Sequence, residues 1–133
     1  MSYSITPLVN YVSTLVIDVN AASAEQLANQ LRHSGFAADS ATSCPAALSA
    51  LRARYYGSMV FVGDLSDPRD LKCIAELRNR VPRTWLIMIS ATTLHDTREL
   101  FLRYGVDALL VTPFSVQDLA SRLLAFSMRS RPP

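Results

Sequence analysis

Two aspartates, Asp18 and Asp64, could bind a hard cation or react with a phosphoryl group. Asp18 follows one short apolar run and Asp64 follows another, while Ser90 ends a third run and the Thr-Pro-Phe turn of residues 112–114 follows a fourth. Aspartate oxygens are ligands that Mg²⁺ prefers, and a carboxylate can also act as a nucleophile toward phosphorus. The alternative is that these aspartates only cap the turns that follow their strands.

Such a site requires elements that bring the ends of these runs together. Five short apolar runs, rich in β-branched residues, alternate with five helical patterns. This alternation predicts an α/β fold, a doubly wound (βα)5 open parallel sheet of the flavodoxin-like kind, with ligands at the carboxyl ends of its strands. We expect strands at residues 14–19, 36–41, 58–62, 85–90 and 108–111, and helices that begin at Ser23, Ser43, Asp67, about residue 96 and Ser115.

Length and composition limit the classes of protein. The 133 residues suit one domain, half of them are hydrophobic, and the net charge of +2 gives no argument for nucleic acid. The sequence has neither a signal-peptide pattern nor an apolar run of about 20 residues. We therefore expect a cytoplasmic protein that does not bind membranes or nucleic acid. We divide it into a leader (1–12), a domain (13–126) and a tail or linker start (127–133).

Several other reactive residues fit ordinary structural roles. Cys44 and Cys73 form no CxxC pair, and we expect two separate buried thiols in a reducing compartment. His33 and His95 are expected to be solvated. A solvated face, rather than a phosphate or RNA site, is expected for the basic cluster Arg78, Arg80 and Arg83.

The ordered set of residues at the strand ends resembles the response-regulator receiver family of two-component systems. The resemblance spans residues 14–126, and each matching feature is weak alone. It rests on the order and spacing of Asp18, Gly35, Asp64, Pro68, Ser90-Ala91, Gly105 and Thr112-Pro113-Phe114.

The resemblance implies roles for four residues. Asp64 matches the phosphoacceptor, and Asp18 matches the first residue of the acidic pair that holds Mg²⁺. Ser66 matches the residue whose backbone carbonyl completes the metal site. Ser90 matches the hydroxyl that binds the phosphoryl group.

Three positions depart from the family pattern. Val19 stands where the family has a second acidic metal ligand, Thr112 where it has a lysine, and Leu109 where it has a switch aromatic. Phosphoryl transfer to a carboxylate needs positive charge close to the equatorial oxygens of the phosphoryl group. Loss of one such electrostatic partner raises the activation barrier by about 3–4 kcal/mol. The single lysine of the chain, Lys72, falls on the third expected helix.

These losses predict a divergent receiver, or pseudo-receiver, whose degraded phosphorylation site binds no metal or only weak Mg²⁺ at Asp18 and Asp64, and which uses no other cofactor. One alternative is that Asp67 or Asn20 replaces the missing ligand, or that an arginine reaches in for the lysine. The domain would then be a conventional receiver phosphorylated at Asp64 by a histidine kinase. An enzyme on the same fold is disfavoured, because the sequence has no Gly-rich phosphate loop and no Ser-His or Cys-His pair.

We therefore expect signalling through protein partners, which include a second copy of the chain, a histidine kinase or an output domain. In receivers, the fourth helix, the fifth strand and the fifth helix form the face that changes on phosphorylation. The interface candidates here are Phe101, Tyr104 and Arg122, although amphipathic helices bury one apolar stripe in any case.

Overall fold

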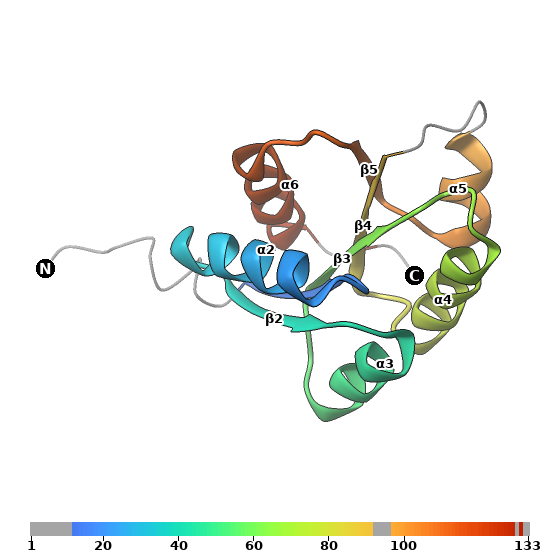
Figure 1. The fold of residues 1–133 in the computed structure, drawn as a ribbon, viewed down its shortest axis with the longest axis horizontal. Coiled ribbons are helices and arrows are strands. Elements are labelled where there is room, and N and C mark those ends of the chain that lie inside the picture. Colours follow the sequence, from blue (N-terminus) through green and yellow to red (C-terminus); the bar gives the residue numbers. More distant parts are fainter. Residues whose placement is uncertain (1–11, 92–96, 130, 132–133) are drawn as a thin grey trace, which may run out of the picture.

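The computed structural model describes residues 12–91, 97–129 and 131. Strands and helices alternate through this part of the chain (Figure 1). In chain order the elements are β1 (Ser13–Ile17), α2 (Ala21–His33), β2 (Ala37–Ala41), α3 (Cys44–Ala53), β3 (Ser58–Gly63), α4 (Pro68–Arg80), β4 (Trp85–Ser90), α5 (Thr97–Tyr104), β5 (Ala108–Val111) and α6 (Val116–Ser127).

The five strands form one parallel sheet in the order β2-β1-β3-β4-β5. The register pairs Gly63 at the end of β3 with Ser90 at the end of β4, and Ser90 in turn with Val111 of β5. The doubly wound (βα)5 fold expected from the alternation is thereby confirmed.

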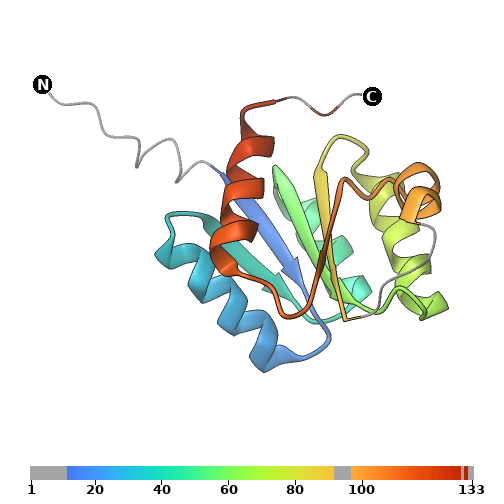
Figure 2. The same ribbon diagram turned by 90° about the horizontal axis from the view of Figure 1, so that it is seen from above.

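Helices cover both faces of the sheet, α2 and α6 one face and α3, α4 and α5 the other (Figures 1 and 2). Leu15 and Ile17 of β1 belong to the core under α3 and α4, whereas Val16 between them belongs to the core under α2 and α6. Since both faces are buried, the strands read as nearly continuous apolar runs.

The helix starts follow local capping chemistry, with one correction. Ser43, Asp67 and Ser115 are the N-caps of α3, α4 and α6, as expected. For α2, the expected cap Ser23 is wrong. Asn20 is the N-cap, and its side chain accepts a hydrogen bond of 3.0 Å from the backbone N–H of Ser23, so the cap lies three residues earlier than expected.

The two cysteines form a disulfide, which corrects the expectation of two separate thiols. Cys44 is the first residue of α3 and Cys73 lies in α4, with 5.9 Å between their Cα atoms. Because α3 and α4 pack side by side on one face of the sheet, they bring together residues that are 29 positions apart. No local spacing reveals this contact.

The end of the described chain packs against the domain. Helix α6 ends at Ser127, one residue past the boundary expected for the domain, and Arg131 contacts Asp107 before β5. The use of this tail as a linker remains a prediction. Among the described residues, no helix is long and apolar enough to cross a membrane.

Candidate functional site

The carboxyl ends of the central strands bring together three of the residues expected from the sequence. Asp18 follows β1, Asp64 follows β3, and Ser90 ends β4. The backbone N–H of Leu65, next to Asp64, donates to the Ser90 hydroxyl at 3.4 Å, and the N–H of Thr112 donates to the Ser90 carbonyl at 3.0 Å. The buried Ser90 thus links the loop after β3 to the turn after β5.

Asp18 is a buried carboxylate held by its own loop. The residue is 8% exposed, and its Oδ1 accepts a hydrogen bond of 3.0 Å from the backbone N–H of Asn20. Val19 is 80% exposed, so its isopropyl group meets water at the position where the family places a second ligand. Asn20, one of the alternative ligands, uses its side-chain oxygen to cap α2.

The carboxylate of Asp64 is folded onto the next turn. Its Oδ1 accepts hydrogen bonds from both the backbone N–H of Ser66, at 2.9 Å, and the Ser66 hydroxyl, at 2.7 Å. The backbone N–H of Asp64 donates to Oδ2 of Asp70 at 2.9 Å. Ser66 therefore contacts Asp64 through its donors, whereas the resemblance assigned a role to its carbonyl.

A hollow of about 380 Å³ lies beside Asp18. Its lining includes Asp18, Val19, Asp70 and the ion pair Asp67–Arg69, but not Asp64. Arg69 lines this hollow, and its largely exposed guanidinium contacts Asp67 at 3.2 Å.

Asp67, the second alternative ligand, is already engaged. Its Oδ1 accepts the N–H of Arg69 at 2.9 Å, which caps α4, and its carboxylate also binds the Arg69 guanidinium. The side-chain hydrogen bond from Arg69, followed by the backbone one, lowers the pKa of Asp67 below its ordinary value.

The donor set around Asp18 does not fit a Mg²⁺ site. Mg²⁺ demands an octahedron of oxygens. Val19 offers none, and the oxygens of Asn20 and Asp67 are bound to helix N-termini. Among the described residues, no group of three or more His, Cys, Asp or Glu side chains is placed to hold a metal.

The other departures from the family pattern lie along β5. Thr112 is exposed and uncharged, and Leu109 is half-buried against the core under α3 and α4. Lys72 lines a separate hollow between α4 and α5 together with Arg103 and Tyr104, and it does not line the hollow beside Asp18.

Two of the three interface candidates are exposed. Phe101 on α5 is 38% exposed, and Arg122 on α6 is exposed and paired with Asp118 at 3.4 Å. Tyr104 is half-buried, with the Arg103 guanidinium 5.8 Å from the centre of its ring. Their part in an interface remains a prediction.

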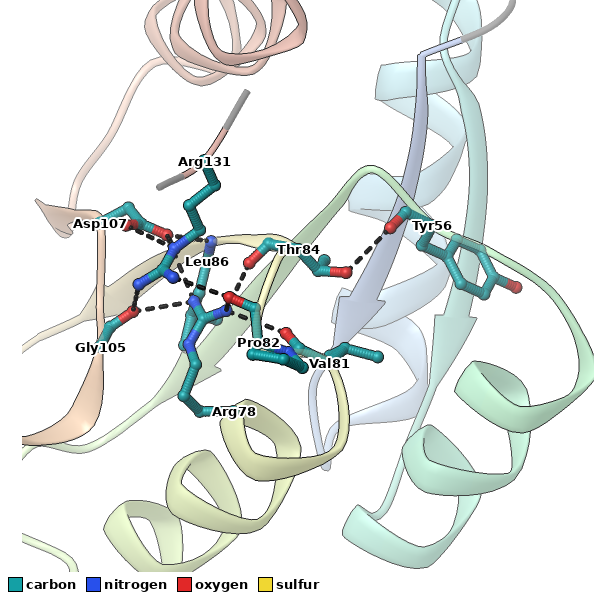
Figure 3. A network of polar contacts seen from close by, with 9 residues as sticks. All are labelled: Tyr56, Arg78, Val81, Pro82, Thr84, Leu86, Gly105, Asp107 and Arg131. Atoms are coloured by element: carbon teal, nitrogen blue, oxygen red, sulfur yellow. Dashed lines mark hydrogen bonds and ion pairs between the residues drawn. The ribbon is translucent and has the colours of Figure 1, made fainter. Parts of the chain in front are cut away.

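A buried polar network that the sequence did not reveal centres on Arg78 (Figure 3). The side chain is 13% exposed, so the expectation of a solvated residue is wrong for Arg78, although Arg80 and Arg83 are exposed. Its guanidinium donates to the Thr84 carbonyl at 2.6 Å and to the Gly105 carbonyl at 2.8 Å, and also to the carbonyls of Val81 and Pro82.

Burial, and then the nearby charge of Arg131, lower the pKa of Arg78 to about 10, against the opposing effect of Asp107. The carboxylate of Asp107 receives Arg78 at 3.2 Å and Arg131 at 3.0 Å. Gly105 has a φ of +69°, and a Cβ there would approach Nε of Arg78 to 2.8 Å. The site therefore needs glycine for its backbone conformation and for its packing. This network ties α4, the start of β4, the segment before β5 and the tail together.

A larger hollow, of about 480 Å³, lies at the amino ends of the strands. Trp85 and Phe126 stack in its wall with ring centroids 4.3 Å apart, and the Arg129 guanidinium lies 5.6 Å from each ring. It shares no residue with the hollow beside Asp18.

The structure is similar to those of receiver domains. A two-component response regulator from Clostridium difficile superposes with a TM-score of 0.77 at 20% identity, covering 89% of this chain and 97% of that chain. The receiver domain of the Francisella response regulator 1452 gives 0.73 at 24% identity, covering 88% and 97%. HP1043, an orphan response regulator of H. pylori, gives 0.73 at 18% identity, covering 89% and 98%.

No protein-family model and no curated protein matches the sequence. At these identities the structural likeness establishes the fold, which is that of a receiver domain over nearly the whole length of the similar chains.

Proposed function

We propose that this chain is a receiver domain of two-component signalling that acts by protein–protein contact and is not phosphorylated efficiently. The receiver fold supports the first part. So does the placement of Asp18, Asp64 and Ser90 at the ends of neighbouring strands. A signalling rather than a catalytic role follows from the absence, in the sequence, of a Gly-rich phosphate loop and of a Ser-His or Cys-His pair.

One observation carries the second part: Val19 stands where the family has an acidic ligand of Mg²⁺, and Thr112 stands where it has a lysine, so neither position helps to bring positive charge to a phosphoryl group. Val19 is a solvated hydrocarbon, and both substitute ligands are engaged as helix caps. Arg69 is engaged by Asp67. Each lost electrostatic partner raises the barrier by about 3–4 kcal/mol, so Asp64 is a poor acceptor even though it is exposed.

The partners that suit this role are proteins: a histidine kinase, an output domain or a second copy of the chain. The exposed Phe101 and Arg122 belong to the surface proposed for them. Leu109 is an aliphatic residue in a half-buried position, and it offers no ring to move between two states. The contact surface therefore keeps one shape in the presence or absence of a phosphodonor.

A conventional receiver is the second candidate, because the carboxylate of Asp64 is exposed and lies next to the segment that contacts Ser90. Intact-mass spectrometry after incubation with acetyl phosphate and millimolar Mg²⁺ separates the two. We expect little or no acyl phosphate on the wild-type chain. The Val19→Asp/Thr112→Lys double variant should be labelled more than either single variant, because both changes act on the same developing charge.

The control is Asp64→Asn in the background of the double variant, which should abolish the gained label. Stoichiometric labelling of Asp64 in the wild type would contradict the proposal and return this chain to the conventional receivers. Labelling that survives Asp64→Asn would contradict the assignment of Asp64 as the phosphoacceptor.

A further inference from the structure

The Cys44–Cys73 disulfide forms part of the wall of the hollow beside Asp18. Cys44 is half-buried at the start of α3, directly after the cap Ser43, and Cys73 is buried in α4. Both residues line the same open hollow of about 380 Å³. The disulfide therefore borders an open hollow, and Cys44 is the more exposed of its two residues.

The position of the disulfide connects it to the loop that carries Asp64. Helix α4 begins at Pro68, is capped by Asp67, and bears Asp70, whose Oδ2 accepts the backbone N–H of Asp64. The disulfide joins this helix, one turn further on, to the first residue of α3. It thus restrains the start of α4, and through Asp70 the loop after β3, relative to the neighbouring helix.

We propose that Cys44 and Cys73 are a reversible redox pair, a modification site for a protein dithiol of the thioredoxin class, with Cys44 as the sulfur attacked. A thiolate of the reductant attacks Sγ of Cys44. The Cys44–Cys73 bond breaks, a mixed disulfide forms with Cys44, and Cys73 leaves as a thiolate that takes up a proton.

The second thiol of the reductant then attacks the first sulfur of the reductant, which is bonded to Cys44 in the mixed disulfide. It releases its proton, and Cys44 leaves as a thiolate that is protonated in turn. Two electrons pass from the reductant, which becomes a disulfide, to the pair, which becomes two thiols. Oxidised glutathione reverses this reaction: it accepts two electrons and two protons from the two thiols, and the Cys44–Cys73 disulfide forms again.

The direction of attack follows from the difference in exposure. Access and the choice of sulfur govern thiol–disulfide exchange. Cys44 is half-buried and Cys73 is buried, so Cys44 is the more accessible of the two residues. Reduction removes the covalent link and frees the start of α4. The loop of Asp64 and Ser66 should then open more often.

The regiochemistry can be tested by trapping. The oxidised full chain is incubated with a thioredoxin whose resolving cysteine is replaced by serine, and the mixed disulfide is mapped by peptide mass spectrometry without reduction. We expect the adduct on Cys44. An adduct on Cys73, or a native chain that reacts only after denaturation, would overturn the proposal and leave a purely structural disulfide. A chain that remains two thiols with oxidised glutathione would overturn it as well.

The coupling to the loop can be tested by amide hydrogen exchange of oxidised and reduced wild type and of Cys44→Ser/Cys73→Ser. The reduced wild type keeps this test valid if the variant folds poorly. We expect faster exchange at the N–H of Ser66 in the reduced and double-serine forms, and no change at the N–H of Asp118, which is bonded to Ser115 at the start of α6 on the other face. Equal exchange at Ser66 in both redox states would refute the coupling. No phosphodonor enters either experiment, so their outcome is independent of the phosphorylation test.

Discussion

At the scale of single residues, two buried polar groups hold segments together that are distant in sequence. The carboxylate of Asp107 receives the N–H of Leu86 at 2.9 Å as well as the guanidinium groups of Arg78 and Arg131. The hydroxyl of Tyr56 donates to Oδ2 of Asp39 at 2.6 Å. Because one group of each pair is largely buried, removing its partner leaves a polar group poorly solvated, so these contacts should matter more than fully exposed ion pairs.

The pH dependence of stability should report on Tyr56. Burial, and then the hydrogen bond and charge of Asp39, raise the pKa of Tyr56 to about 12, against a smaller opposing effect of Arg54. Since the unfolded tyrosine titrates near 10, its contribution is fully present below about pH 10 and is lost as the pH rises toward about 12.

Tyr56→Phe should therefore lower the free energy of unfolding by roughly 1.5–3 kcal/mol at pH 7, as expected for a hydrogen bond to a charged group. The difference from the wild type should shrink above about pH 10. Urea unfolding at a series of pH values measures it. Tyr55→Phe is the matched control, since Tyr55 is 76% exposed and should show neither effect; a difference for Tyr56→Phe that does not vary with pH would contradict the raised pKa.

At the scale of elements, the caps both start the helices and occupy the oxygens that might otherwise bind a cation. Asn20 caps α2 directly after Asp18 and Val19, and Asp67 caps α4 shortly after Asp64. The side chains of Asn20 and Asp67 are therefore used to stabilise helix starts. Their oxygens accept backbone N–H groups that would otherwise lack a partner.

Exchange of the cap residue tests this assignment for α2. Asn20→Ala should reduce the free energy of unfolding by about 1 kcal/mol. Ser23→Ala, at the cap position expected from the sequence, should change it by less than about 0.5 kcal/mol, because the Ser23 contact uses its backbone N–H. Denaturant unfolding of both variants gives the comparison, and a larger loss for Ser23→Ala would restore the later helix start.

At the scale of the whole molecule, exposed apolar side chains near the edge strand β5 belong to the proposed contact surface. Phe101 and Leu102 on α5 and Val111 at the end of β5 are exposed. An edge strand also presents unpaired backbone groups that favour association. This surface is the one proposed for a second copy or another protein.

Sedimentation velocity of the wild type and of Phe101→Ala/Arg122→Ala, with and without beryllofluoride, tests the surface. We expect a dimer that the double variant weakens and that beryllofluoride leaves unchanged. Tyr55→Ala, an exposed residue after α3, serves as the control and should sediment like the wild type. A strict monomer at high concentration would exclude the homodimer, and assembly only with beryllofluoride would contradict a constitutive surface.

The sequence by itself determined the order of elements and the positions of Asp18, Asp64 and Ser90 at the ends of strands. These features depend on local signals. Apolar runs mark strands buried on both faces, and Ser43, Asp67 and Ser115 mark helix starts through contacts within three residues. The sequence also determined that the second acidic ligand and the lysine are missing, because this depends only on the residue types at positions 19 and 112.

Only the tertiary structure decided the contacts between distant segments. The packing of α3 beside α4 joined Cys44 to Cys73, and the fold of the chain end brought Arg131 to Asp107, 24 residues away. Such contacts depend on the relative placement of whole elements, and neither periodicity nor residue type carries that information.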